Sequence, residues 1–368
     1  MSVSHADVII IGGGVIGCAV AYNLAKSQVK PLVIDKAGGV GREASRAGAG
    51  ILASHASTRE PYAELCRASL ALYPPLAEEL IAETQIDIEF IQSGSIAVFS
   101  TDAEKNGLIS LAERRVERGF SAEVLTAAQV LELEPAISKE VIGGVRFPHD
   151  AQVRGAKLAK ALAKGAAQLG AQFLFGNPVT AILRKAERAV GVEVNGVAHY
   201  GDTIVIAAGC WSGKMATLVD YSLPIEPVRG QMVLTESMPP LFRHIIDGFG
   251  VYLVPRSDGK VLIGATVEFV GFDNRTTLGG IHGLIESGTT LMPALAEKPI
   301  VQAWSGLRPY SKGGPYLGKL PGCENVIAAS GHYKNGILLS PITGKLIGEL
   351  ITTGRPSMSL EPFRLGKT

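Results

Sequence analysis

Residues 7–17, Asp-Val-Ile-Ile-Ile-Gly-Gly-Gly-Val-Ile-Gly, carry the pattern that decides the fold. An apolar run enters a glycine turn, and an apolar helical pattern follows the turn to about Ser27. A second apolar run, residues 31–34, ends in Asp35. Strand, turn, helix, strand and acid in this order are typical of a dinucleotide-binding βαβ unit.

Each glycine of the turn has its own expected role. Gly12 allows the turn, Gly14 lets a pyrophosphate approach the backbone, and Gly17 lets the helix pack close to the strand. The helix N-terminus offers free N–H groups and a partial positive charge to the phosphates, and Asp35 suits a ribose hydroxyl. Glycine turns also serve plain strand–helix packing, so the pattern alone leaves the dinucleotide and its chemistry open.

The composition narrows the class of protein. A chain of 368 residues is too long for one small core, which predicts two domains or one large discontinuous unit. Lys and Arg number 35 against 34 Asp and Glu, so charge gives no case for nucleic acid or an anionic membrane. Four cysteines without a CxxC spacing predict no metal site and no disulfide framework, and reduced thiols favour the cytoplasm. We expect neither a signal peptide nor a membrane span.

Element patterns alternate along the chain. Nucleotide-type βα units are expected at the start, in the middle and at the end, with a last helix over residues 337–353. Residues 61–84 look helical with a break at Pro74 and Pro75, and residues 86–100 look strand-like. Residues 224–290 alternate as in an antiparallel sheet with one face open to a ligand.

This mosaic predicts a mixed α/β fold in which a discontinuous Rossmann-like domain is interleaved with a second domain. The cofactor domain would comprise residues 1–84, 148–219 and 319–368. The substrate domain, built on a large antiparallel sheet, would comprise residues 85–147 and 220–318.

Several segments together resemble one known family. In chain order they read IIGGGVIGCAVAYNLA with VIDK, AGAGILASHA, VIAAGCWS, PVRGQ, YLVPR, LIGAT, SGLRPYSKGGPYLG and SGHYKNGILLSP. This series resembles the D-amino-acid oxidase-like flavoproteins, and within them the glycine oxidases, over most of the chain. The resemblance implies FAD rather than NAD. Residues 307–320 contain no cysteine, unlike sarcosine oxidases that bind flavin covalently near there, so non-covalent FAD is expected.

The resemblance implies a set of cofactor contacts spread over the chain. The pyrophosphate would lie on Gly12, Gly14, Val15, Ile16 and Gly17, and the adenosine on Asp35, Lys36 and the backbone of Val179. The flavin side would be lined by Ala44, Ser45, Gly48, Ala49, Gly50 and Ile51, with Ala208, Gly209 and Trp211 alongside the cofactor. The isoalloxazine edge would be closed by His332, Tyr333, Lys334, Asn335, Gly336, Ile337 and Leu338. A helix starting near Gly336 would direct its positive end at the charge that develops on reduced flavin.

Three side chains are the candidates for holding a substrate carboxylate. Arg308 presents two parallel donors, and Tyr252 would add its hydroxyl. The other interpretations are an ion-paired surface arginine and a structural buried tyrosine. Lys334 stands where glycine oxidases tend to carry arginine, whereas sarcosine oxidases use lysine in a comparable turn, so substrate preference stays open. Strand alternation should turn Tyr252 and Val254 to one face and point their neighbours away, and Arg256 is not expected to touch the substrate.

Other residues have secondary expected roles. Val267 and Glu268 are expected to line the substrate mouth, where Glu268 would favour a second amine or exclude acidic substrates. His55 and His332 are expected to be structural, because the flavin chemistry needs no side-chain acid or base.

The resemblance implies an oxidase of glycine, sarcosine or small D-amino acids. Hydride transfer from the substrate Cα to flavin N5 would give an imine, then a 2-oxo acid with ammonia or amine, and oxygen would become hydrogen peroxide. With glycine the imine could feed thiazole synthesis for thiamine. The alternatives are a dehydrogenase that uses a quinone or carrier, and a non-enzymatic FAD-binding subunit, against which Tyr252 and Arg308 together argue. The family also implies a homo-oligomer, most often a tetramer.

Overall fold

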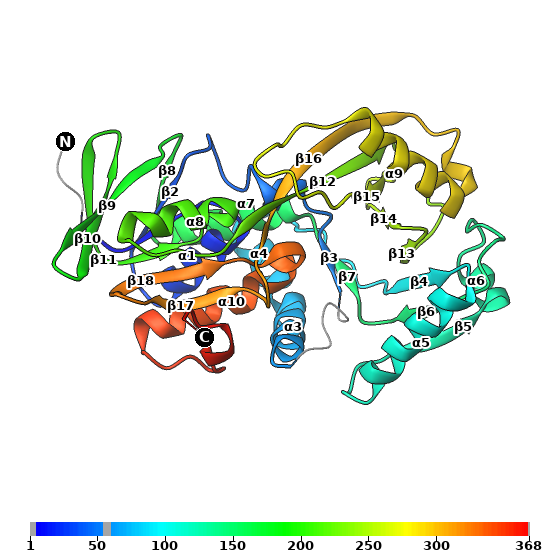
Figure 1. The fold of residues 1–368 in the computed structure, drawn as a ribbon, viewed down its shortest axis with the longest axis horizontal. Coiled ribbons are helices and arrows are strands. Elements are labelled where there is room, and N and C mark those ends of the chain that lie inside the picture. The colour runs from blue at the N-terminus through cyan, green and yellow to red at the C-terminus, as the bar shows by residue number, and fades with distance from the viewer. Residues whose placement is uncertain (1–4, 54–59, 367–368) are drawn as a thin grey trace.

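The structure is a computed structural model that describes residues 5–53 and 60–366, and two large sheets organise it (Figure 1). Five strands of the first sheet run parallel in the order β18, β11, β1, β2, β8. Antiparallel β17 continues this sheet beyond β18, and the β9–β10 hairpin pairs with β11. The strands are β1 (His5–Ile11), β2 (Pro31–Asp35), β8 (Gln172–Phe175), β9 (Val179–Lys185), β10 (Arg188–Val194), β11 (Val197–Ile206), β17 (Tyr316–Leu320) and β18 (Cys323–Ser330).

Helix α1 (Val15–Lys26) is buried over most of its surface, because it packs against both α7 (Gly155–Gln168) and α10 (Gly336–Thr352). Two further helices, α3 (Tyr62–Ala71) and α4 (Tyr73–Thr84), cover the same side of the molecule, where α3 contacts α10 and α4 contacts α7. The expected break at Pro74 and Pro75 lies instead at Leu72. Proline is tolerated in the first turn of a helix, where its missing N–H has no intrahelical partner to lose, so the two prolines begin α4.

The second sheet has the order β16, β12, β15, β14, β13, β4, β6, β5, and its described pairs are antiparallel apart from β13 with β4. This sheet and the parallel one confirm the expected mixed α/β class. Its strands are β4 (Ser95–Phe99), β5 (Glu123–Thr126), β6 (Gly143–Phe147), β12 (Glu226–Thr235), β13 (Ile245–Gly248), β14 (Val251–Pro255), β15 (Val261–Gly264) and β16 (Ile300–Tyr310). Helices α5 (Asp102–Val116), α6 (Ala127–Leu133) and α9 (Leu278–Leu291) pack on it (Figure 1).

Helix α9 lies at the end of the region that was expected to be rich in strands and turns. The four glycines of this helix lower its helix propensity, so its sequence pattern does not predict a helix. Two local contacts compensate: the Thr277 hydroxyl accepts a hydrogen bond from the Gly280 amide, and Gly288 lets α9 approach β15, where an added Cβ would lie 3.0 Å from Ile263. The strand-like pattern expected over residues 86–100 also needs correction, because β4 is the one named strand in that range.

The two sheets draw their strands from different parts of the chain. Strands of the second sheet come from residues 85–147 and 220–318, and those of the first come from the remaining segments, except that β17 already begins at Tyr316. The proposed domain boundaries themselves remain a prediction. Within the described residues, no helix is both long and apolar enough to cross a bilayer.

Candidate functional site

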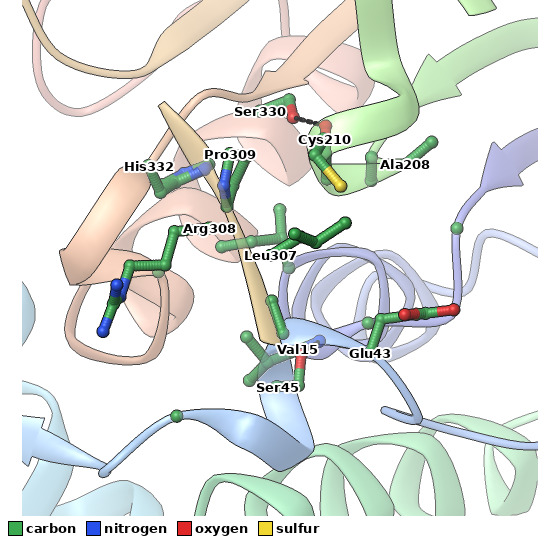
Figure 2. A pocket seen from close by; sticks show the side chains of 18 of the residues that line it. Val15, Glu43, Ser45, Ala208, Cys210, Leu307, Arg308, Pro309, Ser330 and His332 are labelled. Atoms are coloured by element: carbon green, nitrogen blue, oxygen red, sulfur yellow. Dashed lines mark hydrogen bonds between the residues drawn. The ribbon is translucent and has the colours of Figure 1, made fainter. Parts of the chain in front are cut away.

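A deep cavity lies where the parallel strands β1, β2, β11 and β18 end and where strands of the second sheet face them. It contains about 1830 Å³ of space not filled by protein, part of it open to solvent. Figure 2 shows Arg308 on one side of this cavity and Val15, Ser45 and Glu43 on the other. The carboxyl ends of parallel strands are the usual ligand site of such sheets.

The glycine turn after β1 forms one wall, and its glycines serve different purposes. Gly12 has φ +116°, and a Cβ there would lie 2.4 Å from the carbonyl oxygen of Ala207. A Cβ on Gly17 would lie 1.9 Å from the Gly12 carbonyl oxygen, so the fold itself requires both glycines. Gly14 differs, because a Cβ there would meet only Ser45 Oγ, at 3.4 Å. The space over Gly14 therefore suits a ligand that approaches the backbone closely, as a pyrophosphate does.

The acid after β2 is held by backbone amides. Asp35 Oδ2 accepts a hydrogen bond from the Gly13 amide at 2.6 Å, and Oδ1 accepts one from Ala37 at 2.7 Å. Next to it, Lys36 Nζ lies 3.3 Å from the centre of the Trp211 ring and 3.8 Å from Glu43. The fixed carboxylate and this cation–aromatic pair border the cavity at the end expected for adenosine.

Almost every predicted cofactor residue lines this cavity. They are Gly12, Gly14, Val15, Ile16, Asp35, Lys36, Ala44, Ser45, Gly48, Ala49, Gly50, Ile51, Val179, Ala208, Gly209, Trp211, His332, Tyr333, Lys334, Asn335, Gly336 and Ile337. Gly17 and Leu338 are not among the described lining residues, and their expected cofactor contacts stay predictions. Gly17 packs on the Gly12 carbonyl, while Leu338 is fully buried in the core with its carbonyl accepting a hydrogen bond from Ser69.

The three predicted substrate residues come together at the opposite end of the cavity. Tyr252 lies on β14, Arg308 on β16, and Lys334 in the single turn Tyr333–Asn335 before α10. The Arg308 guanidinium lies against Gly230 of the neighbouring β12, where a Cβ would be 2.2 Å from Nη1. Nη1 donates to the Thr266 carbonyl at 3.0 Å. One face of the sheet thus presents Arg308 and Tyr252 toward the turn that carries Lys334.

This end of the cavity is electropositive. Burial lowers the pKa of Lys334, and the positive charge of Arg308 lowers it further. Burial raises the pKa of Tyr252, so its hydroxyl keeps its proton and can donate. The carboxylates among the described lining residues are Asp35 and Glu43, both at the far end. Asp247 does not line the cavity, but its charge acts on Lys334 and Tyr252 and partly offsets the positive charge there. With Arg308 and Lys334 both present, this end still suits an anionic group.

His332 and the start of α10 close the cavity from a third side. His332 is buried, its Nε2 lies 3.0 Å from Thr343 Oγ1, and burial lowers its pKa to about 3. A histidine that stays neutral near pH 7 fits the structural role expected for it; His55 lies outside the described residues. Helix α10 begins at Gly336, as expected, and its first residues line the cavity.

The neighbouring residues Val267 and Glu268 were both expected at the substrate mouth, and the structure places them differently. Val267 lines the cavity, but Glu268 does not. Glu268 pairs with Arg229 at 2.5 Å and accepts a hydrogen bond from Gln231 at 2.8 Å, so its expected role at the substrate mouth is wrong. Arg256 follows the end of β14 and does not line this cavity either.

Several lining residues were absent from the sequence prediction. Glu43, Cys210, Met232, Ala265, Leu307, Pro309 and Ser330 all line the cavity. Leu307 and Pro309 could have been predicted from the sequence, since they flank Arg308. Met232 could not, because its position depends on the pairing of β12 with β16 across about 70 residues of chain, which no local pattern reveals.

Comparison with known proteins agrees with this geometry. Residues 7–350 match the family described as DAO, FAD dependent oxidoreductase, and the chain belongs to this family. Within it, the chain is similar to glycine oxidases. It is 37% identical over 366 residues to the glycine oxidase of Geobacillus kaustophilus (strain HTA426), which covers 98% of this chain and 96% of that protein. A crystal structure of glycine oxidase from Geobacillus kaustophilus superposes with a TM-score of 0.95 at 35% identity, covering 99% of both chains.

Two further relatives carry other names. The bifunctional protein ThiO/ThiG of Trichormus variabilis is 34% identical over 98% of this chain, which corresponds to 55% of that protein. The hydrogen cyanide synthase subunit HcnC of Pseudomonas aeruginosa is 32% identical over 97% of this chain and 95% of that protein.

Proposed function

We propose that this protein is an FAD-dependent oxidase of glycine and other small amines, such as sarcosine and small D-amino acids. One observation carries the proposal: a single cavity joins the glycine turn of a dinucleotide site to an electropositive end formed by Tyr252, Arg308 and Lys334. An amino acid bound there by its carboxylate has its Cα directed back along the cavity. The similarity to glycine oxidases supports glycine as the reference substrate.

The residues around the cavity fit FAD. The open space over Gly14, the N-terminus of α1 and the fixed carboxylate of Asp35 would hold its pyrophosphate and ribose. When bound, FAD would supply the hydride acceptor and the transfer of electrons to oxygen. Burial raises the pKa of the nearby Cys210 thiol to about 12, which leaves it a poor nucleophile and supports non-covalent binding. Yellow colour that remains on the denatured chain would contradict this.

The side chains at the electropositive end bind and orient the substrate. Arg308 and Lys334 hold the carboxylate by charge, and Tyr252 donates its hydroxyl to it. His332 is a poor base because burial lowers its pKa to about 3, and the described residues that line this end of the cavity include no carboxylate that could take a proton from the substrate ammonium. The amine must therefore arrive in its neutral form, and the protein contributes orientation and the exclusion of water.

A peroxide assay tests the proposal directly. Glycine, sarcosine and D-alanine are offered to the FAD-loaded protein in air, and hydrogen peroxide is measured beside the reduction of an electron-accepting dye. Peroxide released from at least one amine supports an oxidase. Dye reduction without peroxide would show that the protein is a dehydrogenase instead. If no amine produces peroxide or reduces the dye, the proposal is contradicted.

A second candidate, transfer of electrons to a partner or carrier, has one structural observation in its favour. Three large apolar side chains, Phe269, Val270 and Phe272, are exposed in the segment that follows cavity-lining Val267. Exposed apolar groups beside a site are typical of surfaces that meet another molecule. The similarity to a hydrogen cyanide synthase subunit points the same way. The dye arm of the same assay separates this candidate from the oxidase.

Three finer points are proposed with the function. The imine formed from glycine would feed thiazole synthesis for thiamine, which the similarity to ThiO/ThiG supports. The protein would be cytoplasmic, and it would assemble as a homo-oligomer, most simply a tetramer. Light scattering of the FAD-loaded protein measures the last point, and a monomeric mass would contradict it.

A further inference from the structure

A second cavity lies behind the wall of the cofactor cavity. It is bounded by residues 42–48, by the first residues of α7 and by the edge of the second sheet, with about 1030 Å³ of unfilled space, part of it open to solvent. Among the described lining residues it shares only Glu43 and Gly48 with the cofactor cavity. A molecule bound here would therefore be distinct from both cofactor and substrate.

Four arginines line this second cavity: Arg42, Arg46, Arg154 and Arg256. Among the described lining residues, Glu43 carries the one carboxylate. It lies 3.8 Å from Lys36, which partly neutralises its negative charge. Arginines at one cavity repel one another unless anions compensate them.

Within the part of the chain that the structure describes, carboxylates form ion pairs with one of the four arginines, Arg154. Arg154 lies 3.0 Å from Glu89 and 2.8 Å from Asp258. Arg256 donates to the neutral oxygens of Gln152 and Ala49, and its buried Nε has no hydrogen-bond partner within the described residues. Over residues 5–53 and 60–366, neither Arg42 nor Arg46 forms an ion pair. Three guanidinium groups are thus left without a paired anion.

The N-terminus of α7 adds to this positive field. Gly155 and Ala156, the first two residues of this 14-residue helix, line the cavity. The residue before them, Arg154, makes no side-chain cap to the helix. The free N–H groups and the helix dipole therefore favour an anion in this cavity, as the arginines do. Burial, and to a smaller extent the charge of Arg154, lower the pKa of Arg256 to about 10, although the charges of Glu89 and Asp258 oppose this shift.

We propose that this cavity is a binding site for a phosphate-bearing anion. Guanidinium groups form paired hydrogen bonds with phosphate oxygens, and a dianion neutralises two uncompensated arginines where a single carboxylate neutralises one. Leu234, Leu262 and Trp304 form an apolar part of the wall, which suits the organic portion of a phosphate ester. Arg42 and Arg46 are exposed at the cavity, so they can close on such a ligand.

Binding of inorganic pyrophosphate to the FAD-loaded protein, measured by titration calorimetry, tests this site. The double variant Arg42→Ala/Arg46→Ala removes two unpaired guanidinium groups from the cavity. The matched control, Arg188→Ala/Arg355→Ala, removes two exposed arginines elsewhere. We expect pyrophosphate to bind the native protein and the control alike, and to bind the cavity variant at least about tenfold more weakly. The FAD content should be the same in all three proteins.

Three results would overturn the assignment. One is the absence of pyrophosphate binding to the native protein, or equal weakening in the control, which would indicate nonspecific attraction. Another is loss of FAD from the cavity variant, which would assign the arginines to the cofactor. The third is a change in oligomeric mass of the cavity variant by light scattering, which would show that a second copy of the chain fills the cavity.

Discussion

The two ends of the cofactor cavity are built in different ways. One end is backbone: the turn over residues 12–17 and the amide-bound Asp35 come from one continuous βαβ segment. The other end is side chain: Tyr252, Arg308 and Lys334 come from two strands and a turn that are far apart in sequence. Under the proposed function, cofactor recognition would depend on local conformation, whereas substrate recognition would depend on the register of a long-range sheet.

This difference predicts different consequences of mutation. A change at the backbone end should remove the cofactor and with it every activity. A change at the side-chain end should leave the cofactor bound and weaken only the carboxylate substrate.

The largest effect is expected from Gly14→Val. Because a Cβ at Gly14 meets only Ser45 Oγ at 3.4 Å, the fold should tolerate a side chain that instead fills the pyrophosphate space. Loss of two charged hydrogen bonds should weaken FAD by about a hundredfold or more. FAD content after gel filtration measures this. The control is Gly38→Val, where a Cβ meets no atom within 4 Å; full FAD in both variants would contradict the assigned role of Gly14.

Arg308→Ala should leave FAD in place and raise the KM for glycine by roughly a hundredfold. The reason is the loss of a buried, charge-assisted pair with the substrate carboxylate. Steady-state kinetics of the FAD-loaded variant give this value, with Arg243→Ala as the control for an exposed arginine beside the same sheet. An unchanged KM would remove Arg308 from the substrate site.

Tyr252→Phe should raise the KM for glycine by about tenfold. Phenylalanine keeps the ring packed against Gly264 and removes only the donor to the carboxylate. Tyr310→Phe is the comparison, because Tyr310 contacts the Tyr333 ring but does not line the cavity. Equal effects of the two changes would argue for a purely structural Tyr252.

The smallest effect concerns Lys334 and pH. Its pKa is lowered below the ordinary lysine value, so it is charged at low pH and loses its charge at a lower pH than an ordinary lysine does. Affinity for acetate, a carboxylate with no amine to titrate, should therefore fall a few-fold as pH rises through that pKa. In Lys334→Arg the fall should disappear, since arginine stays protonated. The same fall in both proteins would assign the titration to another group.

The sequence could predict the backbone end in detail because its signals are local. The spacing of Gly12, Gly14 and Asp35 is read directly from neighbouring residues, and the structure places all three at the cavity. Gly17 has the packing role that the pattern predicts, because a Cβ there would lie 1.9 Å from the Gly12 carbonyl oxygen.

The residues at the side-chain end could be predicted only from the resemblance to a family. The contacts that those residues and their neighbours make could not be predicted at all. Glu268 looked like a substrate residue because it follows Val267 in a motif, yet its partner Arg229 lies on β12, 39 residues away. Pairing of that kind is decided by sheet register, which a single sequence leaves undetermined. Helix α9 was missed for the opposite reason, since its glycines conceal a helix that tertiary contacts stabilise.

Under the proposed function, the electropositive end presents an amino acid to the cofactor. Anaerobic mixing of glycine with the FAD-loaded protein tests this most directly, by following the yellow flavin absorbance. The native protein should bleach, and Arg308→Ala should bleach only at far higher glycine concentration. Failure of glycine, sarcosine and D-alanine to bleach a fully FAD-loaded native protein would contradict it.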